Sequence, residues 1–271
     1  MSFASDTAVR RIARGRYDAT IATGWDIGGN ANGGYLMALC ARALADAAGR
    51  PDPVALTAHF LAPGKPGAVS VETEVARAGR RFATVTGSLT DAEGRAIVQL
   101  LGTFGELVGA EGPERMEAAP PELPPPDACA VLPREEAVSA FRDRVEMRLH
   151  PDDAGYAAGA PSGEPRVRGW FRLPGDEPID TLALLLGADS FPPTIFNAKL
   201  PVGWVPTLEL TTHLRARPAP GWLRCAFTTR FVTGGFLEED GELWDESGRL
   251  VAQSRQLALV PRAAREPAAP G

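Results

Sequence analysis

Gln256 stands in surroundings that do not suit a glutamine side chain. Segment 249–260 has the alternation of a β-strand, in which every second side chain shares a face. On that face Gln256 is joined by small or apolar residues: Leu250, Ala252, Ser254, Ala258 and Val260. A buried amide without partners costs about 1–3 kcal/mol, so we interpret Gln256 as a polar group kept for chemistry. A glutamine that bonds nearby backbone, or that faces solvent, is the alternative.

Asp189 is the second candidate, because it ends a predicted helix over residues 180–189. The carboxyl end of a helix carries partial negative charge, so a carboxylate there has a raised pKa. A raised pKa lies closer to neutral pH, which suits a general base. The alternative is a solvated aspartate that caps its own turn. Thr207 begins a predicted strand. Threonine is common in strands, so this residue by itself does not indicate a catalytic role.

The glycine-rich segment GGNANGG at 28–34 matches neither a dinucleotide motif nor a phosphate loop. Gly33 and Gly34 would let a substrate approach backbone N–H groups at a helix N-terminus, as in an oxyanion hole. Close packing of that helix is an equal alternative. Arg80 and Arg81 lie in a predicted tight turn, where their guanidinium groups could bind phosphates or simply be solvated.

Composition limits the classes of function. The chain has 271 residues and a net charge of −6, which argues against a nucleic-acid binder. Its three cysteines and three histidines have neither disulfide-framework nor metal-ligand spacing, so no metal is expected. No apolar run approaches the ~20 residues of a membrane helix, and no signal peptide is recognisable, which predicts a cytoplasmic protein. No G-x-S-x-G elbow supports an acyl-serine mechanism.

The sequence repeats itself at an offset of 154 residues. LTDAEGRAIVQ at 89–99 matches LWDESGRLVAQ at 243–253, and TAHFLAPGKPG at 57–67 matches TTHLRARPAPG at 211–221. Two separate segments in one register predict two copies of one module. His59 and His213 recur at this offset, which favours a structural role for both. Gln256 corresponds to Gly102, so the polar residue is present in one copy only.

The predicted organisation is an N-terminal module (1–105), a Pro-rich linker (106–133), a C-terminal module (134–262) and a flexible tail (263–271). Each module is expected to be α+β, with an antiparallel sheet curled around one apolar helix. The first helix follows Asn32, a good N-cap, and ends at Gly49. The predicted strands are 54–61, 68–77, 80–90 and 95–105, then 141–149, 166–173, 205–216, 221–232, 236–245 and 249–260.

Five segments resemble the acyl-CoA thioesterase II family of double hotdog proteins: NANGGYLMALCARAL, AHFLAPGKPG, GADSFPP, TLELTTHLRARP and GRLVAQSRQLALV. The resemblance implies hydrolysis of acyl-CoA by direct attack of water, with Asp189, Thr207 and Gln256 as the catalytic residues. It also implies an acyl-CoA substrate, no cofactor and a homo-oligomer. Arg80 and Arg81 would then contact the CoA phosphates, and Gly33 and Gly34 the reacting carbonyl.

The sequence departs from the family pattern beside two of these residues. Leu208-Glu209-Leu210 follows Thr207 where the family usually has Asp-His, and Leu257-Ala258 follows Gln256 where it usually has Glu-Gly. These departures keep open a hotdog protein that binds acyl-CoA without hydrolysing it. A hotdog dehydratase or hydratase is a weaker alternative, because strands rather than an acid-bearing helix follow His59.

Overall fold

The computed structural model describes residues 2–107, 113, 115–133, 140–175, 177–200 and 203–261. The N-terminal half contains α1 (Phe3–Asp6), β1 (Val9–Ala13), β2 (Arg16–Ile21), β3 (Asp26–Ile27), β4 (Asn30–Ala31), α2 (Gly33–Ala48), β5 (Asp52–Phe60), β6 (Gly67–Ala78), β7 (Ala83–Asp91) and β8 (Ala96–Gly105). The C-terminal half contains β9 (Glu146–Leu149), β10 (Arg166–Arg172), α4 (Thr181–Gly187), β11 (Thr207–Leu214), β12 (Leu223–Thr228), β13 (Val232–Thr233), β14 (Phe236–Trp244) and β15 (Leu250–Leu259), with the short 3-10 helices η1 (Pro126–Ala128), η2 (Pro151–Asp153), η3 (Gly155–Ala158) and η4 (Thr194–Asn197).

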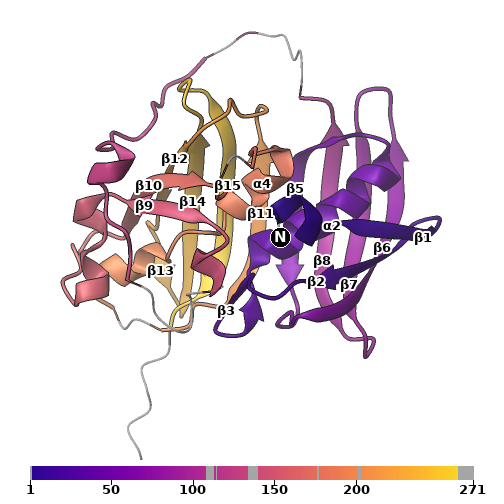
Figure 1. The fold of residues 1–271 in the computed structure, drawn as a ribbon, viewed down its shortest axis with the longest axis horizontal. Helices are drawn as coiled ribbons and strands as arrows, with labels where there is room; N and C mark the ends of the chain where they lie inside the picture. Colours follow the sequence, from indigo (N-terminus) through magenta and orange to yellow (C-terminus); the bar gives the residue numbers. More distant parts are fainter. Residues whose placement is uncertain are drawn as a thin grey trace, which may run out of the picture.

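One antiparallel sheet curls around α2 in the first half and α4 in the second (Figure 1). Its strand order is β1-β2-β6-β7-β8-β5-β11-β15-β14-β12-β10-β9, with β13 beside β14. The strand order is symmetric about the β5–β11 pair. Moving away from that pair, strands β8, β7, β6 and β2 of the first module occupy the same places as β15, β14, β12 and β10 of the second. This is the predicted α+β architecture of two modules.

The two modules meet at an approximate two-fold axis between β5 and β11. Thr57 pairs with Thr211, its own counterpart at offset 154, and their Oγ1 atoms lie 2.8 Å apart. The repeat also holds inside the sheet, since Val85 pairs with Gly102 on β7–β8 and Glu239 pairs with Gln256 on β14–β15. The offset read from the sequence is therefore a structural equivalence.

Helix α2 begins and ends where its local signals place it. The Asn32 side chain accepts a hydrogen bond from the Tyr35 N–H, and Gly49 closes the helix at φ 59° in the left-handed region. Its residues from Gly34 to Ala41 are all buried, as expected for a helix enclosed by sheet and by α4. Helix α4 has seven residues, all buried, and Asp180 caps it through two backbone N–H groups. Among the described residues, no helix is long and apolar enough to span a membrane.

Some predicted elements differ from those observed. The strand predicted at 141–149 is confined to 146–149, and β1 and β2 before α2 were not predicted. Strand β1 is almost wholly exposed, so its sequence lacks the alternation that reveals a half-buried strand. The helix predicted at 180–189 covers Thr181–Gly187, which leaves Asp189 in the loop that follows.

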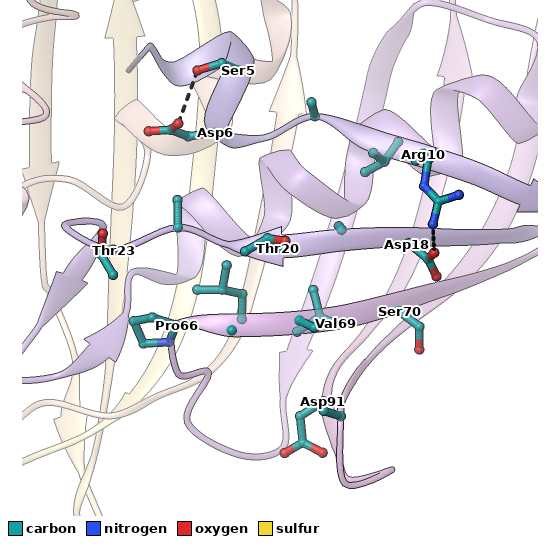
Figure 2. A pocket seen from close by; sticks show the side chains of 18 residues that line it. Ser5, Asp6, Arg10, Asp18, Thr20, Thr23, Pro66, Val69, Ser70 and Asp91 are labelled. Carbon is teal, nitrogen blue, oxygen red and sulfur yellow. Dashed lines mark hydrogen bonds and ion pairs between the residues drawn. The ribbon is translucent and has the colours of Figure 1, made fainter.

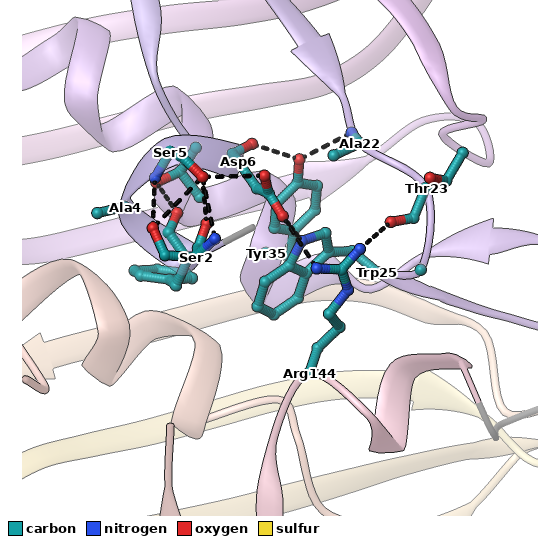
Figure 3. A network of polar contacts seen from close by, with 12 residues as sticks. Ser2, Ala4, Ser5, Asp6, Ala22, Thr23, Trp25, Tyr35 and Arg144 are labelled. Carbon is teal, nitrogen blue, oxygen red and sulfur yellow. Dashed lines mark hydrogen bonds and ion pairs between the residues drawn. The ribbon is translucent and has the colours of Figure 1, made fainter. Parts of the chain in front are cut away.

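Arg144 ties the C-terminal half to the N-terminal half (Figure 3). Its guanidinium donates to the Thr23 carbonyl at 2.8 Å and forms an ion pair of 3.3 Å with Asp6. Asp6 also accepts a hydrogen bond from the Trp25 indole, and the Trp25 ring stacks on Tyr35 of α2 with centroids 5.0 Å apart. This network anchors the segment before α2, which fixes the start of that helix.

The second part of the predicted linker lies against the C-terminal sheet. The Trp170 indole donates to the Pro124 carbonyl at 2.9 Å, and Ala130 forms a bridge with Leu149 of β9. Cys129 and Leu132 are buried there. The limits of linker and tail remain predictions, and the predicted tail lies outside the described residues.

Candidate active site

Asp189 connects the end of α4 to the beginning of α2. Its Oδ2 atom accepts hydrogen bonds from the Gly34 backbone N–H at 2.8 Å and from Asn32 Nδ2 at 3.0 Å. Asn32 Nδ2 also donates to the Asp189 carbonyl at 2.7 Å. Asn32 thus caps α2 with its oxygen and holds Asp189 with its nitrogen, so the carboxylate faces the positive end of α2.

Burial raises the pKa of the Asp189 carboxyl to about 6, against the opposing effect of the hydrogen bonds from Gly34, Gly33 and Asn32. The direction agrees with the prediction, but the cause is different. The predicted cause was the negative end of the preceding helix, whereas desolvation of a partly buried carboxylate is the larger effect. A carboxyl with this pKa is ionised at neutral pH and still basic enough to accept a proton from water.

Gln256 and Thr207 lie on neighbouring strands, β15 and β11. Gln256 is 7% exposed, as its position on the predicted inner face requires. Thr207 Oγ1 lies 3.5 Å from Gln256 Oε1, a weak hydrogen bond at this length. Thr207 is half-buried and is the first residue of β11. The structure brings these two residues into contact with each other.

Glu239 is a buried carboxyl beside Gln256 that the sequence reasoning missed. The two residues are paired across β14 and β15 on the inner face, and Glu239 is 7% exposed. Glu239 Oε2 accepts a hydrogen bond of 2.7 Å from the Thr194 N–H. The signal was present in the repeat, because Glu239 corresponds to Val85 just as Gln256 corresponds to Gly102. At both positions the repeat therefore has a polar residue in the C-terminal module only.

The Gly33–Gly34 backbone differs from the expected oxyanion hole. The Gly34 N–H is occupied by Asp189 Oδ2, and the Gly33 N–H also stabilises that carboxylate. A Cβ on Gly34 would lie 2.5 Å from the Leu185 carbonyl oxygen and 2.9 Å from Asp189 Cβ. Gly34 therefore serves the close approach of α2 to α4, whereas the alternative interpretation was packing of the helix on the sheet, and the backbone N–H groups of both glycines bind a resident carboxylate.

We expect Gly34→Ala to separate α2 from α4 and displace Asp189, because the added methyl group meets backbone that cannot move aside. The cost should be about 1–3 kcal/mol of unfolding free energy, typical of overpacking. Gly33→Ala is the comparison for the cost in stability, since the atoms nearest its Cβ are side-chain atoms that can move, the end of the Phe60 ring at 2.7 Å and Asp189 Oδ2 at 3.0 Å. Denaturant unfolding of both variants measures the difference, and equal costs would contradict the assignment.

Arg80 and Arg81 lie far from Asp189. The Arg80 carbonyl accepts a hydrogen bond from Arg50, just beyond the C-terminus of α2, while Gly33 and Gly34 form its N-terminus. Sixteen helical residues separate these ends, about 24 Å at the usual rise per residue. The Arg81 guanidinium lies over the neighbouring Phe82 ring, with 5.3 Å between its Cζ and the ring centroid. The structure does not join this turn to the Asp189 cluster.

A second buried aspartate occupies the corresponding place at the other end of the helix pair. Asp52 follows α2 and accepts a hydrogen bond of 3.0 Å from Thr181, the first residue of α4. Its carboxylate is 2% exposed and forms an ion pair of 3.1 Å with Arg217. None of the ion pairs among the described residues includes Asp189 or Glu239. Within the described residues, Asp189 and Glu239 therefore differ from Asp52, whose charge is neutralised by Arg217.

A groove of about 1230 Å³ lies on the N-terminal module, along β1, β2 and β6 (Figure 2). It contains none of the residues of the Asp189 cluster. Three aspartates line it, Asp6, Asp18 and Asp91, against one arginine, Arg10, whose charge is paired with Asp18. This charge balance does not suit the phosphates of a nucleotide-like ligand.

The paired modules, each an antiparallel sheet around a helix, define a double hotdog protein. Residues 21–105 match the acyl-CoA thioesterase N-terminal domain family, and residues 120–260 match the acyl-CoA thioesterase C-terminal domain family. The chain belongs to the acyl-CoA thioesterase family.

Three relatives illustrate this membership. An uncharacterized protein of Mycobacterium tuberculosis is 32% identical over 259 residues, covering 88% of each chain. A Thermobifida fusca protein, solved as a candidate thioesterase II, has 35% identity and a TM-score of 0.88, covering 96% of this chain and 97% of its own. An acyl-CoA thioesterase II from Mycobacterium marinum shares the fold at 17% identity, with a TM-score of 0.70 and coverage of 97% and 99%.

Proposed function

We propose that this protein hydrolyses acyl-CoA thioesters to the free acid and CoA by direct attack of water. The observation that carries the proposal is the Asp189 carboxyl, which is held at the N-terminus of α2, forms no ion pair with any described residue and has a pKa of about 6. Such a group is ionised at neutral pH and is tuned for proton transfer. Membership of the acyl-CoA thioesterase family supports the class of substrate.

In the proposed reaction, Asp189 accepts a proton from water as the water oxygen bonds to the thioester carbonyl carbon. The hydrogen bonds with Asn32 and Gly34 go to Oδ2, so Oδ1 is assigned to the water. The carbonyl oxygen becomes an oxyanion, which the Gln256 amide would stabilise. The C–S bond then breaks, and the sulfur leaves with the bonding electrons as the CoA thiolate. Thr207 would position the amide through its contact with Gln256.

The exposure of the histidines argues against the dehydratase alternative. His59 and His213 are both exposed and therefore lie on the outer face of the sheet, whereas Gln256 and Glu239 are buried on the inner face. The cysteines do not offer a nucleophile either, because burial raises the pKa values of Cys40 and Cys225 well above their usual range. An activated water remains the nucleophile that the site supports best.

We expect wild-type protein to release thiol from at least one member of a panel of acyl-CoAs of graded chain length. Gln256→Ala should lower kcat by about 100-fold, the usual cost of removing one oxyanion donor. A thiol-reactive dye measures release. If wild type releases no thiol across the panel but binds acyl-CoA in calorimetry, the non-catalytic binding alternative is correct. If Gln256→Ala retains full turnover, this assignment of the amide is wrong.

Self-association, which the family resemblance implied, and a cytoplasmic location, which the sequence predicted from its lack of a recognisable signal peptide, are also part of the proposal. The fused modules already form one internal pair through β5 and β11, so a homo-oligomer would be built from double-hotdog protomers. Sedimentation velocity on the purified protein would measure its oligomeric state, and a monomer at all concentrations would overturn this part.

A further inference from the structure

Glu239 is a buried carboxyl group that the reaction proposed above does not use. A carboxyl group belongs on the surface or beside a cation, because transferring an unpaired charge to the interior is costly. Glu239 has neither among the described residues, since it is 7% exposed and is hydrogen-bonded by the backbone N–H and side chain of Thr194. Its counterpart in the other module is Val85, so the fold does not require a carboxyl at this place.

The charged groups that act on Glu239 are both negative. Asp189 acts from the loop after α4 and Glu238 from the opposite face of β14. The Glu238 carboxylate is bound by the backbone N–H groups of Arg230 and Phe231 and forms an ion pair with the Arg230 guanidinium. Asp189 is hydrogen-bonded by Gly34 and Asn32, but no ion pair in the described part of the chain includes it. In the part of the chain that the structure describes, Glu239 also has the neutral Gln256 amide as its cross-strand neighbour and the Thr194 hydroxyl as a hydrogen-bond partner, and that hydroxyl lies 2.6 Å from the Thr229 hydroxyl.

We propose that Glu239 is a positioning residue of this site, which stays neutral while Asp189 is ionised so that the buried pair carries one negative charge. The inference rests on the proposed function and adds to it the charge state in which the site works. A second carboxylate would repel the oxyanion that forms on the substrate, whereas a neutral carboxyl does not. A neutral carboxyl can also donate a hydrogen bond beside Gln256, which a carboxylate cannot.

The pKa values agree with this assignment. Burial and the neighbouring Asp189 raise the pKa of Glu239 to about 7, above the value of about 6 for Asp189. The geometry supports the same order, because Asn32 and the backbone at the N-terminus of α2 stabilise the Asp189 carboxylate, whereas Glu239 accepts a backbone hydrogen bond from Thr194, the first residue of the short 3-10 helix η4, whose dipole is smaller. Asp189 should therefore lose its proton first as the pH rises, and Glu239 second. Between these values the pair holds one proton and one negative charge, and the two steps are properties of the coupled pair.

The test compares the dependence of kcat on pH for wild type, Glu239→Gln and Glu239→Val, from about pH 5 to 9. Wild type should show a bell-shaped profile whose alkaline limb falls about 50-fold from pH 7 to 9, as one ionisation near pH 7 requires. Glu239→Gln is permanently neutral and should keep the acidic limb but lose the alkaline limb. Glu239→Val, which copies the other module, cannot hydrogen-bond and should lower kcat across the range.

Glu242→Gln is the matched control, because Glu242 lies on the outer face of the same strand and its carboxylate accepts a hydrogen bond from the Trp244 indole. It removes one carboxylate from β14 and should leave the profile unchanged. The proposal is overturned if wild type has no alkaline limb near pH 7, if Glu239→Gln retains that limb, or if Glu239→Val matches wild type.

A stability measurement separates failure of this inference from failure of the proposed function. If no acyl-CoA is hydrolysed, the reaction assignment fails, but the coupling of the two carboxyls can still be measured. The Tm gained by Glu239→Gln over wild type should grow from about pH 5 to 8, and should grow less in an Asp189→Asn background. An equal gain in both backgrounds would show that the carboxyls do not interact and would overturn the proposal.

Discussion

Asp189→Asn should abolish most turnover while making the protein more stable above pH 6. Removing a general base costs about 10²–10⁴-fold in rate, so we expect kcat for thiol release to fall about 1000-fold. The stability gain has a separate cause. Burial raises the pKa of Asp189 from 3.8 to about 6, so the folded state binds the proton more tightly than the unfolded state. The stability that this group contributes is complete below pH 4 and is lost as the pH rises to 6.

This loss of unfolding free energy should be about 3 kcal/mol, because a pKa change of one unit corresponds to roughly 1.4 kcal/mol. The asparagine variant does not titrate, so its advantage in unfolding free energy should grow from pH 4 to 6 and then level off. Urea unfolding at several pH values measures this change. Asp52→Asn is the control, since Asp52 occupies the corresponding place but is paired with Arg217. It should keep turnover and lose stability, and the reverse pattern would contradict the site assignment.

Among the substitutions that should leave the candidate active site intact, Arg217→Met should be the most destabilising. Asp52 is 2% exposed and receives three contacts of 3.1–3.2 Å from the Arg217 guanidinium. Removing one partner of a buried ion pair leaves an uncompensated charge, which costs about 3–5 kcal/mol. Arg217 is itself half exposed, so we expect the lower end of that range, about 3 kcal/mol. Denaturant unfolding at neutral pH measures it.

The double variant Arg217→Met with Asp52→Asn should recover part of that loss, because the amide removes the unpaired charge. Its hydrogen bonds with Thr181 and the Leu107 N–H can persist in the asparagine. Turnover should stay within a few-fold of wild type in all three proteins, since this pair lies at the end of α2 opposite Asp189. Additive losses in the double variant would show that Arg217 acts through packing instead of charge.

Local signals in the sequence determined the elements and their faces. Asn32 and Gly49 bound α2 as predicted, and the four strands expected after it were found within a few residues. The alternation around Gln256 correctly placed that side chain on the buried face of β15. The offset of 154 gave the two-module fold. These features depend on neighbours in the chain or on a repeat, which one sequence displays.

The composition of the site was decided by tertiary structure. Asp189 was expected to respond to its own helix, but it faces the N-terminus of α2, and its Asn32 partner lies 157 positions away. Glu239 joins the site because β14 pairs with β15, and Asp52 is neutralised by an arginine 165 positions away. Arg80 and Arg81 lie at the far end of α2. Burial and charge pairing depend on how distant segments pack, and a linear sequence does not specify those distances.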